Sequence, residues 1–273
     1  MSEESAELSK EYETGPEGPE DDVEMGFFEH LGELRMRLVR GVIGIIPGVI
    51  VAWIFKERLL EWFLAPLVHA YARLGLGEPE IHFANPVEPF IGYLKIAIVC
   101  GLVGSAPWLF YQLWAFISPG LYKREKLMAI PFVFFSTLCF AGGAVFGYSI
   151  VFPMGFETLL GFAGLLPEQS ITMTPTIMLG EYLSFSTRLL IAFGVVFEVP
   201  VVVVMLSSAG IVTPGRLWSF GRWWVIIAAV ISAILTPQDV GSMVVMLFPL
   251  IGLYFGSIPL AWLLKKRSKT KSE

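Results

Sequence analysis

Long uncharged apolar runs, separated by short charged segments, constrain the fold of this chain more than any other feature. A helix needs about 20 apolar residues to cross a bilayer. Only Glu198 interrupts these runs, which cover residues 41–55, 96–122, 127–156, 189–215, 223–238 and 240–264. Leu38, Val39 and a snorkelling Arg40 extend the first run towards spanning length. The sequence therefore predicts an all-α, polytopic membrane protein with six transmembrane helices.

The composition excludes most other classes of protein. Of the 273 residues, 55% are hydrophobic and only 16% are charged, whereas a soluble domain has about 25% charged residues. No basic face is available to bind nucleic acid. No nucleophile–base pair, glycine-rich phosphate loop or metal-ligand cluster indicates an enzyme or a cofactor. Cys100 and Cys139 lie in apolar runs, where cysteine behaves as a small hydrophobic residue.

Lys and Arg are distributed unequally between the two sides of the predicted spans. Three bases fall on one side, namely Lys56, Arg58 and Arg73. Fourteen fall on the other, namely Lys10, Arg35, Arg37, Arg40, Lys123, Arg124, Lys126, Arg216, Arg222, Lys265, Lys266, Arg267, Lys269 and Lys271. Because cytoplasmic loops carry an excess of Lys and Arg, both termini are predicted to lie in the cytoplasm and the spans in the cytoplasmic (inner) membrane.

Charge and composition divide the chain into three regions. Residues 1–24 contain ten acids and a single base within a chain of net charge −5, and cannot bury enough apolar surface to fold. We expect this region to be a disordered, acidic cytoplasmic tail. Residues 25–264 are the predicted six-helix membrane domain, and residues 265–273 are a basic cytoplasmic tail.

Several features predict a curved bundle with unequal spans. Prolines within helices remove hydrogen bonds and tend to bend them, although proline is also common in membrane helices in general. In this chain, prolines occur in or beside most spans, at Pro47, Pro107, Pro131, Pro153, Pro200, Pro249 and Pro259. The fifth run has only 14 uncharged residues from Trp223 to Thr236, about 21 Å of helix. Either the bilayer is thinned locally there, or this helix is flanked by protein and not by lipid. The amphipathic stretch 57–74 predicts a surface helix that caps the bundle, and Asp239 marks a tight turn between spans five and six.

Two acids occur among bases on the predicted cytoplasmic side. Residues 27–38 have the apolar spacing of an amphipathic helix, and Glu33 and Arg37 lie four residues apart on its polar face. One interpretation is a surface helix whose arginines only enforce topology, but this does not explain Glu33. Glu125 follows Lys123 and Arg124, and one interpretation is that it only balances local charge in a solvated loop.

A third acid, Glu198, lies inside the fourth apolar run. A lone carboxyl group in a membrane segment costs several kcal/mol unless it is paired, hydrated or protonated. Pro200 follows two residues later and frees backbone groups in the same region. A functional role is therefore expected for Glu198, and the alternative is a carboxyl group that is satisfied by packing.

These segments together resemble TatC, the core receptor subunit of the twin-arginine protein translocase. The resemblance extends over about residues 27–265. It rests on F-E-H-L-G-E-L-R-M-R-L at 28–38, A-P-L at 65–67, N-P-V-E-P-F at 85–90, S-A-P-W-L-F-Y-Q-L-W-A-F-I-S-P-G-L-Y-K-R-E at 105–125, V-F-P at 151–153, A-F-G-V-V-F-E-V-P at 192–200 and L-T-P-Q-D-V at 235–240. It implies a concave, glove-like bundle that binds signal peptides with consecutive arginines. Such proteins act with TatA- and TatB-like single-span partners in a self-associating complex, and export folded proteins with the proton-motive force.

The resemblance also assigns roles to individual residues. It implies that Glu33 and Glu125 receive the two arginines of a signal peptide, held in place by Arg35, Arg37, Lys123 and Arg124. It implies that Glu198 and Gln112 supply polarity to the concave, peptide-facing side. Structural or assembly positions are Pro66, Pro86, Phe90, Tyr122 and Asp239. The chain departs from some relatives at Met243, where they have a glutamine, so a polar contact to a partner is in doubt there.

Two other functional classes are alternatives. In a proton-coupled small-solute transporter Glu198 would carry the proton, but such proteins are expected to have more intramembrane charges, an internal repeat and a midplane site, and the sequence indicates none of these. A structural membrane scaffold without a ligand does not explain paired acids among the cytoplasmic bases.

Overall fold

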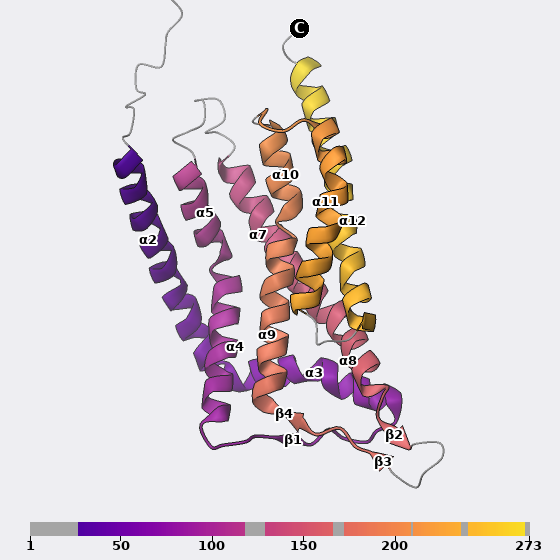
Figure 1. The fold of residues 1–273 in the computed structure, drawn as a ribbon. Helices are drawn as coiled ribbons and strands as arrows, with labels where there is room; N and C mark the ends of the chain where they lie inside the picture. Colours follow the sequence, from indigo (N-terminus) through magenta and orange to yellow (C-terminus); the bar gives the residue numbers. More distant parts are fainter. Residues whose placement is uncertain (1–26, 118–128, 166–171, 209, 236–239, 271–273) are drawn as a thin grey trace, which may run out of the picture.

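The computed structural model describes residues 27–117, 129–165, 172–208, 210–235 and 240–270. The predicted tail at 1–24 and the end of the C-terminal tail at 271–273 lie outside these ranges. Long helices lie side by side along one direction (Figure 1). These are α2 (Phe27–Ile54), α4 (Glu88–Gly104), α5 (Ala106–Ile117), α7 (Ala129–Phe146), α8 (Phe152–Leu160), α9 (Leu179–Val196), α10 (Val199–Ser208), α11 (Pro214–Leu235) and α12 (Val240–Thr270).

The two ends of this bundle differ. At one end, which we call the terminal end, α2 begins and α12 finishes (Figure 1). At the other, the cap end, α3 (Lys56–Leu74) crosses beneath the long helices together with the strands. The predicted surface helix at 57–74 is thus confirmed, and it ends at Gly75, whose φ of 66° is readily accessible to glycine. Pro66 is buried within α3.

Short strands, which were not predicted, complete the cap. Strand β1 (Ile81–His82) pairs in parallel with β4 (Ile177–Met178), and Ile81 is in register with Ile177. Strand β2 (Gly164–Leu165) pairs antiparallel with β3 (Thr172–Met173). The first pair ties the segment before α4 to the start of α9.

The described helices fit a multi-pass membrane protein. Four stretches are apolar and long enough to cross a bilayer, at Leu31–Ile54, Ile130–Leu160, Leu179–Ser208 and Pro214–Leu235. Helices α4 and α5 add a fifth if they are counted as one bent span, whereas the apolar stretch of α12, Met246–Trp262, is shorter. Six spans, cytoplasmic termini and a glove-like shape therefore stay predictions.

Three of the passes along the bundle are broken, and proline follows each break. Helices α4 and α5 meet at an angle of 58°, α7 leads into α8 through the π-helical turn η2 (Gly147–Val151), and α9 stops two residues before α10. Pro107, Pro153 and Pro200 are the second residues of α5, α8 and α10. The missing N–H of proline is harmless in a first helical turn. The predicted bend is confirmed at Pro107. Pro153 and Pro200 follow interruptions inside the single stretches Ile130–Leu160 and Leu179–Ser208, and Pro47, Pro249 and Pro259 lie inside continuous helices.

The fifth run belongs to a longer helix than its charge-free stretch indicated. Helix α11 has 22 residues, about 33 Å at the helical rise, because it continues through Arg222 and Arg216 towards the terminal end. The expectation of a 21 Å helix was therefore wrong. It treated the first charged residue as a helix end, although long basic side chains readily reach a membrane surface from within a helix. Helix α12 similarly continues to Thr270, within the predicted tail.

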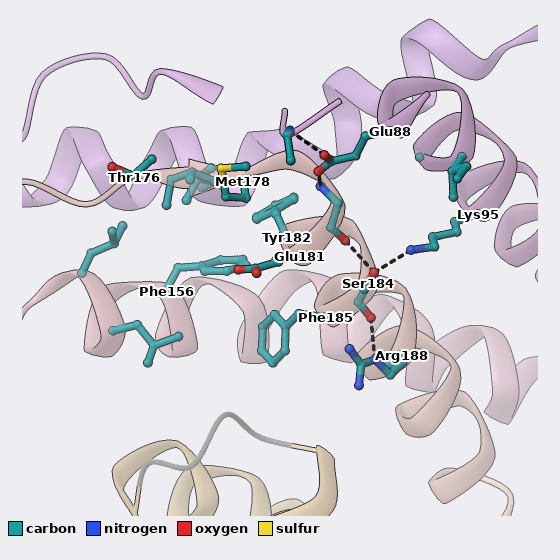
Figure 2. Close-up of a pocket in the computed structure, with 18 of the residues that line it drawn as sticks. Glu88, Lys95, Phe156, Thr176, Met178, Glu181, Tyr182, Ser184, Phe185 and Arg188 are labelled. Carbon is teal, nitrogen blue, oxygen red and sulfur yellow. Dashed lines mark hydrogen bonds between the residues drawn. The ribbon is translucent and has the colours of Figure 1, made fainter. Parts of the chain in front are cut away.

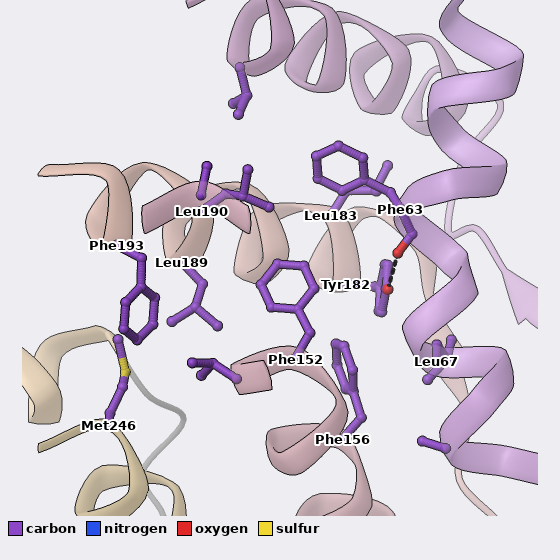
Figure 3. Close-up of a cluster of buried hydrophobic side chains, with 14 of the residues drawn as sticks. Phe63, Leu67, Phe152, Phe156, Tyr182, Leu183, Leu189, Leu190, Phe193 and Met246 are labelled. Atoms are coloured by element: carbon purple, nitrogen blue, oxygen red, sulfur yellow. Dashed lines mark hydrogen bonds between the residues drawn. The ribbon is translucent and has the colours of Figure 1, made fainter. Parts of the chain in front are cut away.

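The main core joins the cap to the long helices. Phe63 and Leu67 of α3 pack with Phe152 of α8 and with Leu183 and Phe193 of α9, all nearly inaccessible to solvent (Figure 3). The hydroxyl of Tyr182 donates a hydrogen bond of 2.5 Å to the Phe63 carbonyl oxygen inside this cluster. This core fixes the height of α9 relative to the cap, and therefore the depth of every polar residue on α9.

Candidate binding groove

The polar face of α2 presents one ion pair near its start. Arg37 Nε donates a hydrogen bond of 2.8 Å to Glu33 Oε1, and an Arg37 terminal nitrogen lies 2.6 Å from the same oxygen. The pair follows from the i,i+4 spacing on a helix. Glu33 Oε2 is buried and has no hydrogen-bond partner among the described residues. Arg37 thus binds one carboxylate oxygen of Glu33, and the other oxygen can still accept a hydrogen bond.

The structure does not place the other predicted charged residues beside the Glu33–Arg37 pair. Arg35 is exposed and forms no ion pair within the described part of the chain. The loop with Glu125 and its neighbours Tyr122, Lys123 and Arg124 lies outside the described residues. Asp239, in the predicted turn between α11 and α12, also lies outside them.

Glu198 is positioned by the break between α9 and α10. Its backbone N–H bonds to the Val195 carbonyl at 3.0 Å, and its own carbonyl accepts the Val202 N–H at 2.9 Å. It therefore lies in a tight turn with an i to i−3 hydrogen bond, and Pro200 follows in the first turn of α10. The turn places a carboxyl group between two apolar segments, residues 189–197 and 199–206.

Glycines bring α7 close to this turn. A Cβ on Gly143 would lie 2.4 Å from the Phe193 carbonyl oxygen, and one on Gly194 would lie 2.7 Å from the Phe140 ring. This close packing leaves the Ser136 hydroxyl of α7 next to the Glu198 carboxyl group. Glu198 Oε1 and Ser136 Oγ are nevertheless both buried without a hydrogen-bond partner among the described residues.

Gln112 supplies a third polar group, from α5. Its side chain is 6% exposed, and its Oε1 atom also has no hydrogen-bond partner in the described ranges. A buried amide oxygen without a partner costs about 1–3 kcal/mol. A ligand that donates a hydrogen bond to this oxygen would remove that cost.

These groups border one groove, which we call the Glu198 groove. It has a volume of about 440 Å³, and its polar side chains are Arg37, Gln112 and Glu198. The other lining residues are apolar, namely Leu34, Leu38, Gly41, Val42, Leu102, Ala106, Leu109, Phe110, Leu113, Phe116, Phe140, Ile191 and Val195. Leu38, Leu113 and Val195 are exposed, so the groove is open along one side. It offers an apolar channel with hydrogen-bonding groups at three points and the Glu33–Arg37 pair at one end.

The assembly positions lie elsewhere. Phe90 is exposed on α4, and its ring packs edge-on against Trp53 with centroids 5.6 Å apart. Pro86 is exposed in the segment before α4. The Met243 carbonyl oxygen accepts a 2.6 Å hydrogen bond from Ser232 Oγ, so this position ties α12 to α11 through its backbone rather than its side chain.

Three polar residues were missed by the sequence argument. Lys95 and Arg188 were treated as the edges of apolar runs, yet both lie inside helices α4 and α9. Ser136 gives little signal in the sequence, because a single serine in an apolar run adds no charge. The sequence did contain a signal for Arg188. It is a charged residue beside a long apolar run, and charged residues inside a membrane are costly and therefore often functional.

Gly194 provides a test of the packing that positions Glu198. Gly194→Ala places a Cβ against the Phe140 ring and is expected to destabilise the protein by about 1–3 kcal/mol, measured as a lower Tm in detergent. Gly142→Ala is the matched control, because a Cβ on Gly142 meets nothing within 4 Å. Equal Tm values for the two variants would contradict the close approach of α7 and α9.

Comparison with known proteins agrees with this architecture. The family model described as TatC, Sec-independent protein translocase protein, matches residues 29–249. TatC proteins from Desulforapulum autotrophicum and Aquifex aeolicus are 40% and 38% identical, over 90% of this chain in each case and over 88% and 98% of their own lengths. A crystal structure of the twin-arginine translocase receptor TatC in DDM superposes with a TM-score of 0.75 at 38% identity, covering 85% of this chain and 99% of that one. The chain therefore belongs to the TatC family, whose members are multi-pass inner-membrane components of the Sec-independent protein translocase and not enzymes.

Proposed function

We propose that this protein is the receptor of a twin-arginine translocase. It binds signal peptides with consecutive arginines at the cytoplasmic face and takes part in exporting folded proteins with the proton-motive force. The observation that carries the proposal is the Glu33–Arg37 pair at one end of the open, apolar Glu198 groove. A carboxylate followed by an apolar channel matches the order of a signal peptide, whose arginines precede its apolar segment.

The chemistry at Glu33 favours arginine over lysine. A guanidinium group presents a planar fork of donors that fits a carboxylate, whereas an ammonium group is a compact point charge. Glu33 Oε2 is free to accept within the described residues, while Arg37 holds Oε1. Glu125 is proposed to receive the second arginine, with Lys123 and Arg124 keeping it ionised.

The Glu198 groove is proposed to receive the apolar part of the peptide. Its walls come from α2, α5, α7 and α9, and they bury apolar side chains without requiring a particular sequence. Gln112 and Glu198 then offer acceptors for backbone N–H groups of a peptide that is not fully helical. Such acceptors are valuable in a membrane, where unpaired backbone groups cost several kcal/mol.

The proposed complex contains further chains. TatA- and TatB-like single-span helices would pack on the flank of α11, whose exposed side chains include Trp218, Trp223, Ile226 and Val230. Further copies of this chain would join the same receptor complex. The shared position of the α2 start and the α12 end supports the proposal that both termini are cytoplasmic.

An export assay with two signal peptides tests the function. A folded reporter with an Arg-Arg signal peptide should be exported by cells that depend on this chain. The same reporter with Lys-Lys should be exported about tenfold less or worse, because each lost bidentate contact is worth about 1.5–3 kcal/mol. Equal export of both reporters would contradict arginine recognition. Export of neither, with uptake of a small solute that depends on Glu198, would instead indicate the transporter.

A further inference from the structure

A second, larger cavity lies at the cap end, separate from the Glu198 groove. Its volume is about 840 Å³, and α4, α8, α9 and the end of α11 form its walls (Figure 2). It contains four charged side chains, namely Glu88, Lys95, Glu181 and Arg188. Neither the proposed signal-peptide contacts nor the core packing uses them. Because these helices are apolar, the charges need a specific explanation.

The charges are arranged in two layers. On α4, Lys95 follows Glu88 by seven residues, and on α9, Arg188 follows Glu181 by seven residues. Seven residues are about two helical turns, or about 10 Å, so each acid shares a helix face with its base. Both helices begin at the cap end. The acids therefore lie towards the cap and the bases lie deeper in the bundle.

The two bases converge on one residue. Lys95 Nζ donates a 2.6 Å hydrogen bond to Ser184 Oγ, and Arg188 Nε donates a 2.9 Å hydrogen bond to the Ser184 carbonyl oxygen (Figure 2). Neither base forms an ion pair within the described residues. The terminal guanidinium nitrogens of Arg188 and two ammonium protons of Lys95 remain available, since no other hydrogen bond is formed by them in the described ranges.

The acids differ in availability. Both oxygens of Glu88 accept backbone N–H groups, from Gly180 at 2.6 Å and from Ala84 at 2.7 Å. Glu88 thus joins α4 to the start of α9, and its hydrogen-bonding capacity is used there, although its charge still acts on Lys95. Glu181 is exposed and forms no ion pair or hydrogen bond within the described part of the chain. The groups with unused hydrogen-bonding capacity are therefore one acid near the cap, Glu181, and two bases about two turns deeper.

Much of the remaining lining is apolar, although Asn85, Thr176, Tyr182 and Ser184 also contribute to it. The apolar part includes Ile91, Phe185 and, at the end of α11, Ile234 and Leu235. Ile234 is 75% exposed. Helix α11 thus ends at this cavity, whereas α9 continues nine residues from Arg188 to its start at Leu179. That distance is about 14 Å towards the cap.

We propose that this cavity binds the headgroup of a phospholipid that carries an amine, with its phosphate at Lys95 and Arg188 and its ammonium group at Glu181. In such a lipid the phosphate lies next to the glycerol and the amine lies further towards water, which is the order of the charges here. Water lies beyond the cap on whichever side the cap faces, so the proposal does not depend on the orientation of the protein. The acyl chains would run along Ile234 and the adjacent face of α11.

Lipid retention measured by native mass spectrometry tests the proposal. The purified protein is mixed with phosphatidylethanolamine, phosphatidylglycerol or diacylglycerol. We expect both phospholipids to be retained and diacylglycerol, which has no phosphate, to be lost. The double variant Lys95→Gln/Arg188→Gln should retain phosphatidylethanolamine about tenfold less. Arg58→Gln is the matched control, because Arg58 is an exposed base on α3 outside the cavity, and it should behave as the unchanged protein.

Two further variants distinguish the role of the acid from that of the bases and distinguish loss of binding from loss of folding. Glu181→Gln should weaken phosphatidylethanolamine but not phosphatidylglycerol, and Arg188→Lys should preserve binding because it preserves the charge. Equal retention of diacylglycerol and phospholipid, or undiminished retention by the double variant at an unchanged Tm, would overturn the proposal. Displacement of the lipid by a millimolar excess of inorganic phosphate would also overturn it, and would assign the bases to free phosphate.

Discussion

Glu125→Ala is expected to abolish most signal-peptide docking. If Glu125 receives an arginine, its loss removes a charge-assisted, bidentate contact worth about 1.5–3 kcal/mol, or about 10- to 100-fold in affinity. The measurement is photocrosslinking of an Arg-Arg signal peptide to this chain in membranes, together with export of its folded cargo. Both signals should fall together, because docking precedes every later step.

Two control variants make this result interpretable. Glu125→Asp keeps the carboxylate and should retain part of the docking. Glu78→Ala removes an exposed acid at the cap end and should leave docking unchanged. Normal crosslinking and export by Glu125→Ala would show that Glu125 only balances the charges of Lys123 and Arg124.

Glu198→Leu is expected to separate docking from transport. The substitution removes the acid from the Glu198 groove but leaves the Glu33–Arg37 pair intact. First contact with the peptide should therefore stay within about twofold of the unchanged protein, while export falls at least about tenfold, the effect of losing a contact of about 1.4 kcal/mol or more. The two readouts come from the same crosslinking and export assays.

The stability of this variant distinguishes a functional from a structural acid. Glu198 Oε1 has no hydrogen-bond partner among the described residues, and replacing such a buried group with an apolar one is neutral or stabilising. The Tm of Glu198→Leu in detergent should therefore be unchanged or higher. A large loss of expression or a lower Tm would indicate that Glu198 holds the fold together. Glu198→Gln keeps a polar side chain, and it shows whether the charge itself is needed.

Local structure was predictable where a single residue type dictates the backbone. The bend at Pro107, and the starts of α8 and α10 one residue before Pro153 and Pro200, follow from the missing N–H and the ring of proline. The cap helix ending at Gly75 follows from its amphipathic pattern and the following glycine. These signals act within a few residues, so they do not depend on the rest of the fold.

Distant encounters were not predictable in the same way. Arg37 lies on the amphipathic segment 27–38, and Gln112 and Glu198 lie in separate apolar runs, so nothing in their spacing specifies that they line one groove. Their meeting depends on tertiary packing, such as Gly143 and Gly194 allowing α7 and α9 to approach. Resemblance to a family suggested that Gln112 and Glu198 share a side of the bundle. It gave no indication of Lys95 and Arg188, whose meeting at Ser184 is visible only in the structure.

The 58° angle between α4 and α5 has a mechanical consequence for the groove. Gln112 lies seven residues beyond the joint at Ser105, about 10 Å along the axis of α5. At 58°, that arm carries its backbone about 9 Å sideways from the line of α4, close to a full helix diameter of about 10–12 Å. Straightening this one joint would move Gln112 by about that distance relative to α4, so the bend at Ser105 helps to determine where α5 lines the groove. Each degree at the joint moves Gln112 by only about 0.2 Å, so the large bend, and not small changes in it, sets that position.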